Sequence, residues 1–227
     1  MMDDSILDSP VWAALSGPHR RFAETVGQAA RYQPDVSPFV AVAPTAGPGV
    51  WDDVAKLVGP GSAVTVTGTA PPPPADWEVV MDLAGVQLVD VSLAAAPDPA
   101  AVVLTAADVP EILDLVARTQ PGPFLRRTVE LGTYLGIRHE GRLVAMAGER
   151  LRPPGWTEIS AVCTDAEFRG RGLATRLVRA VAAGIRARGE QPFLHTSASN
   201  TGAIRLYESI GFRLRRRTRF RAVRVPG

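Results

Sequence analysis

The segment from Glu158 to Arg188 restricts the fold more than any other part of the chain. It begins with a largely apolar run that ends at Cys163 and is expected to form a strand. It ends with a long amphipathic helix that starts at about Leu173. Between the two lies a turn with the sequence Arg-Gly-Arg-Gly, residues 169–172. The segment therefore predicts a strand that runs through a glycine turn directly into a helix.

This turn has the features of an anion-binding site. Backbone N–H groups in the first turn of a helix have no intrahelical partner, and the helix dipole makes that end positive. Glycines let the main chain approach a ligand, and Arg169 and Arg171 add forked donors, so the arrangement suits a diphosphate. A dinucleotide-binding turn is disfavoured, because Thr175 stands where that fingerprint requires glycine or alanine. The Gly-Lys-Ser/Thr of NTPase phosphate loops is absent from the sequence.

A helix-hostile connector, residues 94–99, divides the chain into two parts. We expect a small α/β domain over residues 1–97, without a chemical motif, and a second domain over residues 101–227. In the first part the patterns predict helices over 11–30 and 51–58, and strands over 39–42, 63–67, 78–81 and 86–89. In the second they predict a helix that starts near 105, helices over 124–131, 173–188 and 201–210, strands over 134–139, 143–148, 158–163 and 193–197, and a β-rich tail. The expected fold is α/β, a mixed, mostly antiparallel sheet with helices on both faces.

Composition and charge exclude several classes of protein. The 227 residues are 46% hydrophobic and carry a net charge of +2, which indicates neither a nucleic-acid partner nor a membrane partner. The single cysteine, Cys163, cannot form an internal disulfide, and the three histidines lack metal-ligand spacing, so no metal is expected. The N-terminus lacks the pattern of a signal peptide, and no apolar run approaches a membrane span. We expect a cytoplasmic protein.

Two ordered motifs resemble the signatures of the GNAT acetyltransferase superfamily. Residues 169–174, Arg-Gly-Arg-Gly-Leu-Ala, are similar to its Arg/Gln-x-x-Gly-x-Gly/Ala signature. Residues 200–212, from Asn200 through Tyr207 to Gly211-Phe212, resemble its second signature. Residues 123–150 resemble a bacterial branch related to glycine N-acyltransferases. The resemblance covers about residues 101–222, and by analogy the first part could be a degenerate copy of the same fold.

The resemblance implies a binding site for acetyl-coenzyme A. The strand before the glycine turn would splay from its neighbour and bind the pantetheine arm through Val162, Cys163 and Thr164. The pyrophosphate would be held by main-chain N–H groups of residues 169–175, that is Arg169, Gly170, Arg171, Gly172, Leu173, Ala174 and Thr175. Asn200 could be a helix N-cap, a cofactor contact, or both.

The resemblance also implies catalytic roles in a direct attack of an amine on the thioester. Tyr207 would be the general acid for the departing thiolate, and the backbone N–H of Val162 would stabilise the oxyanion. Glu158 is the candidate general base, and Glu149 is its rival. Each of these carboxylates could instead be a strand-end partner of an arginine, and Tyr207 could be a core aromatic residue. Cys163 is not proposed as a nucleophile, and Tyr134 and His195 could line the acceptor pocket.

Three functions stay open at this level. The first is transfer of an acetyl group to a primary amine of a small-molecule or peptide acceptor, by a monomer or a homodimer. The second is a catalytically silent acyl-coenzyme A sensor. The third is a binding protein that uses the tail from Arg213 to Arg221, where every odd position is arginine and the even positions are mostly apolar. For this tail a solvated outer strand face is the simpler interpretation, and an RNA or acidic partner is the alternative.

Overall fold

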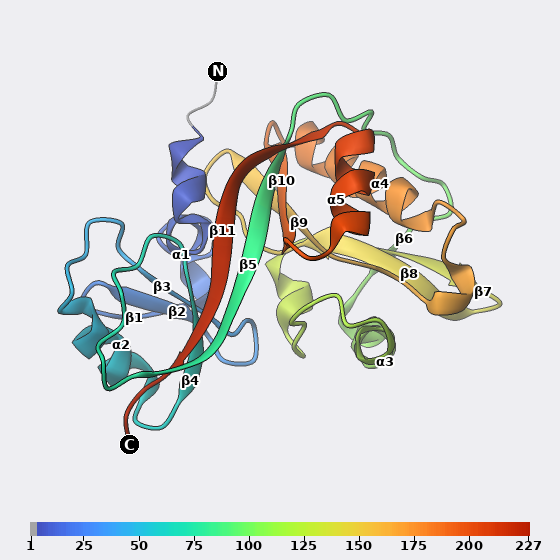
Figure 1. Cartoon of the computed structure of the whole chain (residues 1–227). Helices are drawn as coiled ribbons and strands as arrows, with labels where there is room; N and C mark the ends of the chain where they lie inside the picture. The colour runs from blue at the N-terminus through green and yellow to red at the C-terminus, as the bar shows by residue number, and fades with distance from the viewer. Residues whose placement is uncertain (1–3) are drawn as a thin grey trace.

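The computed structural model describes residues 4–227, which form one continuous mixed sheet of eleven strands (Figure 1). The strand order is β1-β2-β3-β4-β11-β5-β10-β9-β8-β7-β6. In the described part of the chain only β3–β4 and β9–β10 pair in parallel, so the predicted mostly antiparallel sheet is confirmed.

The helices and strands have the following bounds. The strands are β1 (Ala23–Val26), β2 (Ala29–Tyr32), β3 (Phe39–Val42), β4 (Ala63–Thr67), β5 (Glu78–Asp90), β6 (Val102–Leu104), β7 (Tyr134–His139), β8 (Arg142–Glu149), β9 (Trp156–Thr164), β10 (Gln191–Ser197) and β11 (Phe212–Arg224). The α-helices are α1 (Pro10–Leu15), α2 (Val50–Val58), α3 (Val109–Thr119), α4 (Leu173–Ala187) and α5 (Thr201–Ser209). Short 3-10 turns occur at η1 (Ser5–Asp8), η2 (Arg20–Phe22), η3 (Ala106–Asp108), η4 (Thr128–Leu131) and η5 (Ala166–Phe168).

Two long strands, β5 and β11, join the two parts of the chain in the middle of the sheet (Figure 1). β5 is the last strand of the first part, yet its neighbours are β10 and β11 of the second part. β11 is the last strand of the second part, and its other neighbour is β4 of the first. Each part therefore supplies a strand to the other. The division at residues 97–101 stays a prediction, because the hydrogen-bonded sheet runs across it.

Helices pack on both faces of the second half of the sheet, because β8 is apolar on both sides. Val144 faces the core beneath α4, where Leu177 and Val181 are buried. Leu143 and Met146 point the other way, into the core beneath α3. The amphipathic pattern of α4 thus predicts correctly which face of this helix is covered. None of the helices in residues 4–227 is long and apolar enough to cross a membrane.

Several local predictions need correction. The helix expected over residues 11–30 is wrong, since α1 ends at Leu15 and a hairpin, β1–β2, follows around Gly27. The helix expected over 124–131 is only the 3-10 turn at 128–131. The two strands expected over 78–81 and 86–89 are one continuous strand, β5, and the short strand β6 was not foreseen. Helical spacing in short, turn-rich segments gives no reliable signal, because such segments bury too few residues to establish a period.

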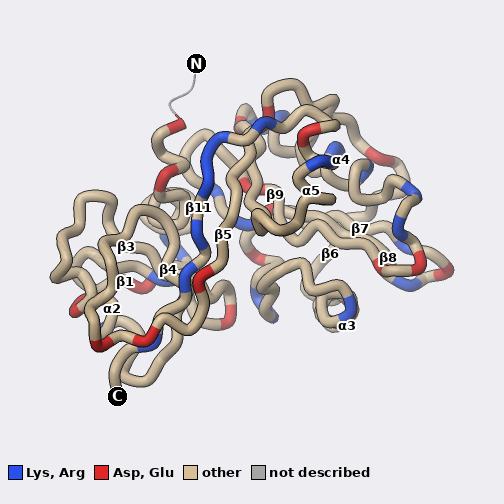
Figure 2. Tube along the Cα trace, in the orientation of Figure 1, with Lys and Arg blue, Asp and Glu red and all other residues tan. Residues whose placement is uncertain are grey.

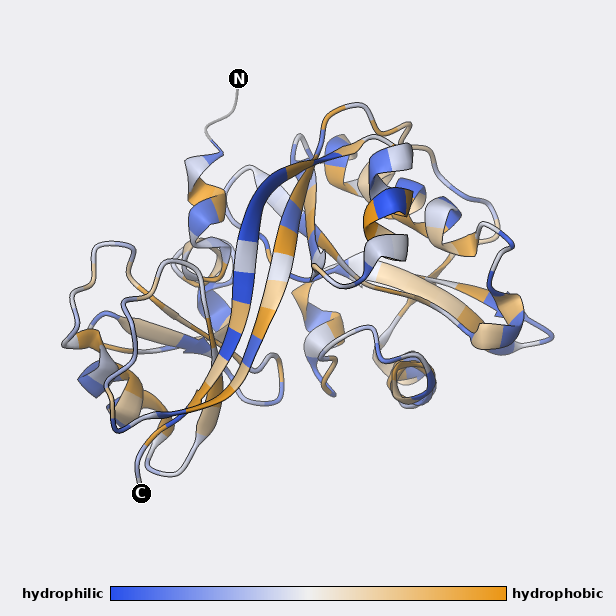
Figure 3. Cartoon of the chain, viewed as in Figure 1, coloured by the Kyte–Doolittle hydropathy of each residue, from blue (hydrophilic) through white to orange (hydrophobic). Residues whose placement is uncertain are grey.

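The arginines of the tail lie on β11, where they are blue in Figure 2, and Figure 3 shows much of the same strand as hydrophilic. Many of them pair with acidic residues of the same chain. Arg215 contacts Asp4 and Asp8, and Asp82 accepts from both Arg219 and Arg221. The acidic partners neutralise much of the charge of the strand, which agrees with the simpler interpretation of a structural, partly solvated face.

We predict that residues 98–227 do not fold alone. Without β5, strands β10 and β11 both lose their shared neighbour, and the backbone groups that pair with it become unsatisfied. Circular dichroism and thermal denaturation of this fragment should show no cooperative transition, whereas co-expression with residues 1–97 should restore one. A cooperative transition in the fragment alone would show that the exchanged strands are dispensable.

Candidate active site

Parallel strands β9 and β10 separate part-way along their length. They pair from Trp156–Gln191 as far as Ile159–Leu194, and beyond that pair both strands continue without a shared register. The separation coincides with a bulge, because β8 pairs with Ser160 and Cys163 but passes over Ala161 and Val162. Ala161 has φ of 52°, an uncommon value for a residue with a side chain. A bulge bends its strand and re-aims the groups beside it, so β9 turns away from β10 here.

The separated strands open into a cleft of about 730 Å³. One end is lined by β9, the start of α4 and α5, through Val162, Cys163, Thr164, Arg169, Ala174, Asn200 and Tyr207. The sequence-predicted residues Gly170, Arg171, Gly172, Leu173 and Thr175 do not line the cleft, although they belong to the same turn and helix start. The cleft therefore brings together the two motifs, which begin at Arg169 and Asn200, 31 positions apart in the sequence.

The glycine turn has the conformation of an anion-binding loop. Gly170 and Gly172 have φ of 77° and 74°, values that glycine adopts without steric cost. Gly172 directly precedes α4. The backbone N–H groups of residues 170–172 have no hydrogen-bond partner within the described chain. Three free donors at a helix start, with Arg169 in the cleft wall, can bind a phosphate group.

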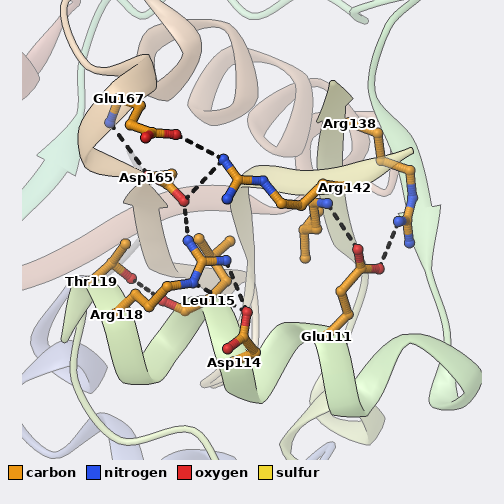
Figure 4. A network of polar contacts seen from close by, with 10 residues as sticks. Glu111, Asp114, Leu115, Arg118, Thr119, Arg138, Arg142, Asp165 and Glu167 are labelled. Carbon is orange, nitrogen blue, oxygen red and sulfur yellow. Dashed lines mark hydrogen bonds and ion pairs between the residues drawn. The ribbon is translucent and has the colours of Figure 1, made fainter. Parts of the chain in front are cut away.

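A charged network fixes the approach to this turn (Figure 4). Asp165, directly after β9, accepts a hydrogen bond from the N–H of Glu167 and an ion pair from Arg118 of α3. Arg118 also binds Asp114, one turn earlier on the same helix. The network ties the C-terminal end of α3, and with it the cleft wall at Thr119, to the segment that leads into the glycine turn.

The second motif contributes a cap and an unpaired phenol. The Asn200 side chain accepts from the N–H of Ala203, so it is an N-cap as well as a cleft residue. Tyr207 lines the cleft, and its hydroxyl makes no hydrogen bond within residues 4–227. Burial, with a smaller effect of Cys163, raises the pKa of Tyr207 to about 12. Burial also raises the pKa of Cys163, which therefore stays a thiol and not a nucleophilic thiolate.

Glu158 is completely buried and does not line this cleft, but it lines a small adjoining cavity of about 40 Å³ that shares Arg150 and His195 with the cleft. Arg150 Nε and Nη2 donate to its two oxygens, both at 2.8 Å. His195 Nδ1 lies 2.7 Å from Oε1. Burial alone would raise the pKa of this carboxyl, but the charge and hydrogen bonds of Arg150, with the hydrogen bond from His195, lower it to about 2. Glu158 is thus a firmly ionised group in a closed pair.

His195 connects this pair to the cleft, which it lines. An ionised carboxylate can only accept hydrogen bonds, so Nδ1 of His195 carries a proton and donates a hydrogen bond to Glu158. The other ring nitrogen, Nε2, lies 3.0 Å from the amide nitrogen of Gln87, a donor that also binds the carbonyl of Leu7. Nε2 therefore accepts from Gln87. This fixes the tautomer and the orientation of the imidazole.

Other predicted residues lie elsewhere. Glu149, the rival base, is buried against Arg188 and does not line the cleft. Tyr134 is buried beside Phe124 and is also outside it. The opposite end of the cleft is instead built by residues without any motif, from the first part of the chain and from β11: Pro38, Phe39, Thr65, Met81, Leu83 and Phe220.

Comparisons with known proteins agree with this geometry. The FR47-like protein family matches residues 134–221. A solved GNAT-family protein from Novosphingobium aromaticivorans is 42% identical and superposes with a TM-score of 0.89, over 99% of this chain and 100% of its own. The chain belongs to the GNAT family. A GCN5-related N-acetyltransferase from Kribbella flavida shares the GNAT fold at 18% identity, with a TM-score of 0.63 over 96% of this chain and 94% of its own.

Two curated GNAT relatives each match about a third of the chain. N-alpha-acetyltransferase RimI of Mycobacterium tuberculosis is 39% identical over 90 residues, which are 37% of this chain and 56% of that protein. Mycothiol acetyltransferase of Thermobispora bispora is 42% identical over 82 residues, 36% of this chain and 27% of that protein. The matches thus span about half of the first relative and a quarter of the second.

We predict that Glu158→Gln destabilises the protein by about 3–5 kcal/mol, because it leaves Arg150, whose side chain is only 12% exposed, without its counter-charge. Chemical denaturation at neutral pH would measure the loss. In the wild type this contribution is complete above the unfolded pKa of 4.5 and is lost as pH falls through about 2. Glu190→Gln is the matched control, because Glu190 pairs with arginines that are more exposed than Arg150, and it should cost much less. Equal losses in the two variants would contradict the assignment.

Proposed function

We propose that the protein transfers an acetyl group from acetyl-coenzyme A to a primary amine by direct attack, without an acyl-enzyme. The main support is the cleft that opens where β9 and β10 separate, with free N–H donors beside one end and an unpaired tyrosine in its wall. Both curated relatives are named as acetyltransferases, which supports the same chemistry. The cytoplasmic location stays a prediction.

The residues at the β9 end of the cleft fit acetyl-coenzyme A. The hydroxyl of Thr164 is buried and has no hydrogen-bond partner within residues 4–227, so it offers a polar contact in a wall that is otherwise largely apolar. Val162, Cys163 and Thr164 would hold the pantetheine arm through the backbone edge that β10 leaves unpaired. Arg169 and the N–H groups of residues 170–175 would hold the pyrophosphate, with Asn200 beside them.

Acetyl-coenzyme A, when bound, supplies the activated thioester. The N–H of Val162, outside the β8 ladder because of the bulge, would stabilise the carbonyl oxygen as it gains charge. Tyr207 would donate its phenolic proton to the departing sulfur. With a pKa of about 12 this phenol stays protonated over the whole working range of pH. The cleft walls hold amine and thioester together, which lowers the entropic cost of the attack.

For proton removal from the ammonium we propose a division of roles between Glu158 and His195. A carboxylate with a pKa of about 2, behind the cleft wall, is a weak base. His195 lines the cleft, and its Nε2 is the ring nitrogen without a proton; to accept one it would have to leave the amide of Gln87, which Leu7 and Arg215 hold in place. Glu158 would then act as a positioning residue that orients the ring and stabilises the imidazolium.

We predict that Tyr207→Phe lowers kcat about 10- to 100-fold while the affinity for acetyl-coenzyme A changes little, because the ring still packs and only the proton donor is lost. Thiol release from acetyl-coenzyme A over a panel of amines would measure turnover, and calorimetry would measure affinity. Unchanged turnover would remove Tyr207 from the mechanism. Binding of acetyl-coenzyme A without thiol release for any amine in the wild type would favour a silent sensor.

We also predict that Gly172→Val weakens binding of acetyl-coenzyme A about tenfold or more. A β-branched side chain disfavours the φ of 74° that aims the free N–H groups. Gly189→Val is the matched control: its φ is 76°, a Cβ would also meet open space, and it lies at the other end of α4. Both variants should lose similar stability, and only the first should lose affinity. Equal affinities would place the pyrophosphate elsewhere.

A further inference from the structure

The charges along the cleft restrict the chemistry of the acceptor. Among the described residues that line it, the basic side chains are Arg150, Arg169 and His195, and none is aspartate or glutamate. Arg169 lies at the end assigned to the cofactor phosphates, whereas Arg150 and His195 lie toward the other end, with Phe39 and Phe220. A polycation such as a polyamine would find no unpaired carboxylate here, because Asp8 and Glu158, which line the small adjoining cavity, are already paired with arginines. An acceptor that carries a negative charge beside its amine would find a guanidinium.

Arg150 has hydrogen-bonding capacity left over. A guanidinium has five N–H donors, and Glu158 uses the side formed by Nε and Nη2. Within residues 4–227 the Nη1 group has no hydrogen-bond partner, so both of its N–H groups and the second N–H of Nη2 are free. These form the end of the fork, the geometry that binds a second carboxylate with two hydrogen bonds. The Phe39 ring lies 4.9 Å from the guanidinium carbon and restricts its orientation.

The wall around this fork is apolar. Leu83 of β5 and Phe220 of β11 are cross-strand neighbours, and Leu83 is 50% exposed. Phe220 can lie over β5 because residue 85 is glycine; a Cβ at this position would lie 2.5 Å from the Phe220 ring. Met81 and Phe39 continue the surface. Exposed apolar side chains in a cleft favour a ligand with an apolar group of its own.

We infer that the acceptor is a small amine that carries a carboxylate and an apolar side chain, with its carboxylate bound by the free end of the Arg150 fork. This inference rests on the proposed acetyl transfer. In that reaction the amine nitrogen forms a bond to the acetyl carbon, and the carbon–sulfur bond breaks. The ammonium loses two protons in all: one balances the proton that the thiolate receives, and the other leaves to solvent. The carboxylate takes no part in the bond changes and remains on the product.

Matched acceptors test the inference on the intact wild-type protein. We expect L-phenylalanine to have a kcat/KM about tenfold or more above that of L-phenylalaninamide and of 2-phenylethylamine, which lack the carboxylate. The amide has the less basic amine and so more free amine at neutral pH, which would favour it in the absence of a carboxylate site. Spermidine should be a poor acceptor. An amide or spermidine rate equal to or above that of the acid would overturn the inference.

A variant pair locates the effect. Arg150→Lys keeps the charge beside Glu158 but loses the forked donors. The ratio of kcat/KM for L-phenylalanine to that for L-phenylalaninamide should therefore fall toward one, because the KM for the acid rises, and the affinity for acetyl-coenzyme A should not change. Arg152→Lys is the control, because Arg152 binds Glu190 outside the cleft, and it should keep the preference. A preference that persists in Arg150→Lys would overturn the assignment of the carboxylate to Arg150. If Arg150→Lys does not fold, the wild-type comparison still decides whether the acceptor needs a carboxylate.

The acceptor class and acetyl transfer itself are distinguished by different outcomes. Thiol release with amines, but without preference for a carboxylate, would overturn the acceptor class and leave acetyl transfer standing. No thiol release with any amine, despite binding of acetyl-coenzyme A, would overturn the proposed function itself.

Discussion

The end of the β9–β10 pairing is the constraint on which the site depends. A parallel pair that continued to Thr164 would bury its own backbone groups and leave no room between the strands. The bulge at Ala161 and Val162 prevents this, because one extra residue on β9 breaks the β8 register and bends the strand. The same distortion frees the N–H of Val162 and opens the cleft. A single irregularity in one strand thus produces the unpaired backbone, the space and a candidate oxyanion donor together.

The exchange of β5 and β11 explains why the first part of the chain matters to a site whose motifs all lie in the second. β5 pairs with β10, so Leu83 and Met81 reach the cleft, and β4 follows β11 in the sheet and brings Thr65. The cofactor end is built from local sequence motifs, whereas the acceptor end is built from long-range strand pairing. Acceptor choice can therefore change through the first part of the chain while the cofactor site stays constant.

The sequence predicts well what is local. The strand, glycine turn and helix from Glu158 to Ala187 have a strong period and clear glycine signals, and they occur nearly where expected. Asn200 as a cap follows the same local logic. The sequence could not show that Phe39 or Leu83 line a cleft, because this depends on strands distant in the chain. The contact of Glu158 with His195 also needed the parallel register, in which Glu158 pairs with Phe193, two residues before His195.

Arg150 links the stability of the site to its chemistry. A largely buried arginine needs a counter-charge, and Glu158 supplies it through two hydrogen bonds of 2.8 Å. The ion pair of Arg150 and Glu158 has no net charge, so it does not repel the ammonium group of an incoming zwitterion. The free N–H groups of Arg150 are still available to a carboxylate, and His195 is hydrogen-bonded to the other side of Glu158. A lone arginine at this position would bind its ligand's carboxylate while repelling the ammonium. The buried carboxylate removes that repulsion, which is why an ionised Glu158 is more useful behind the cleft than as a base inside it.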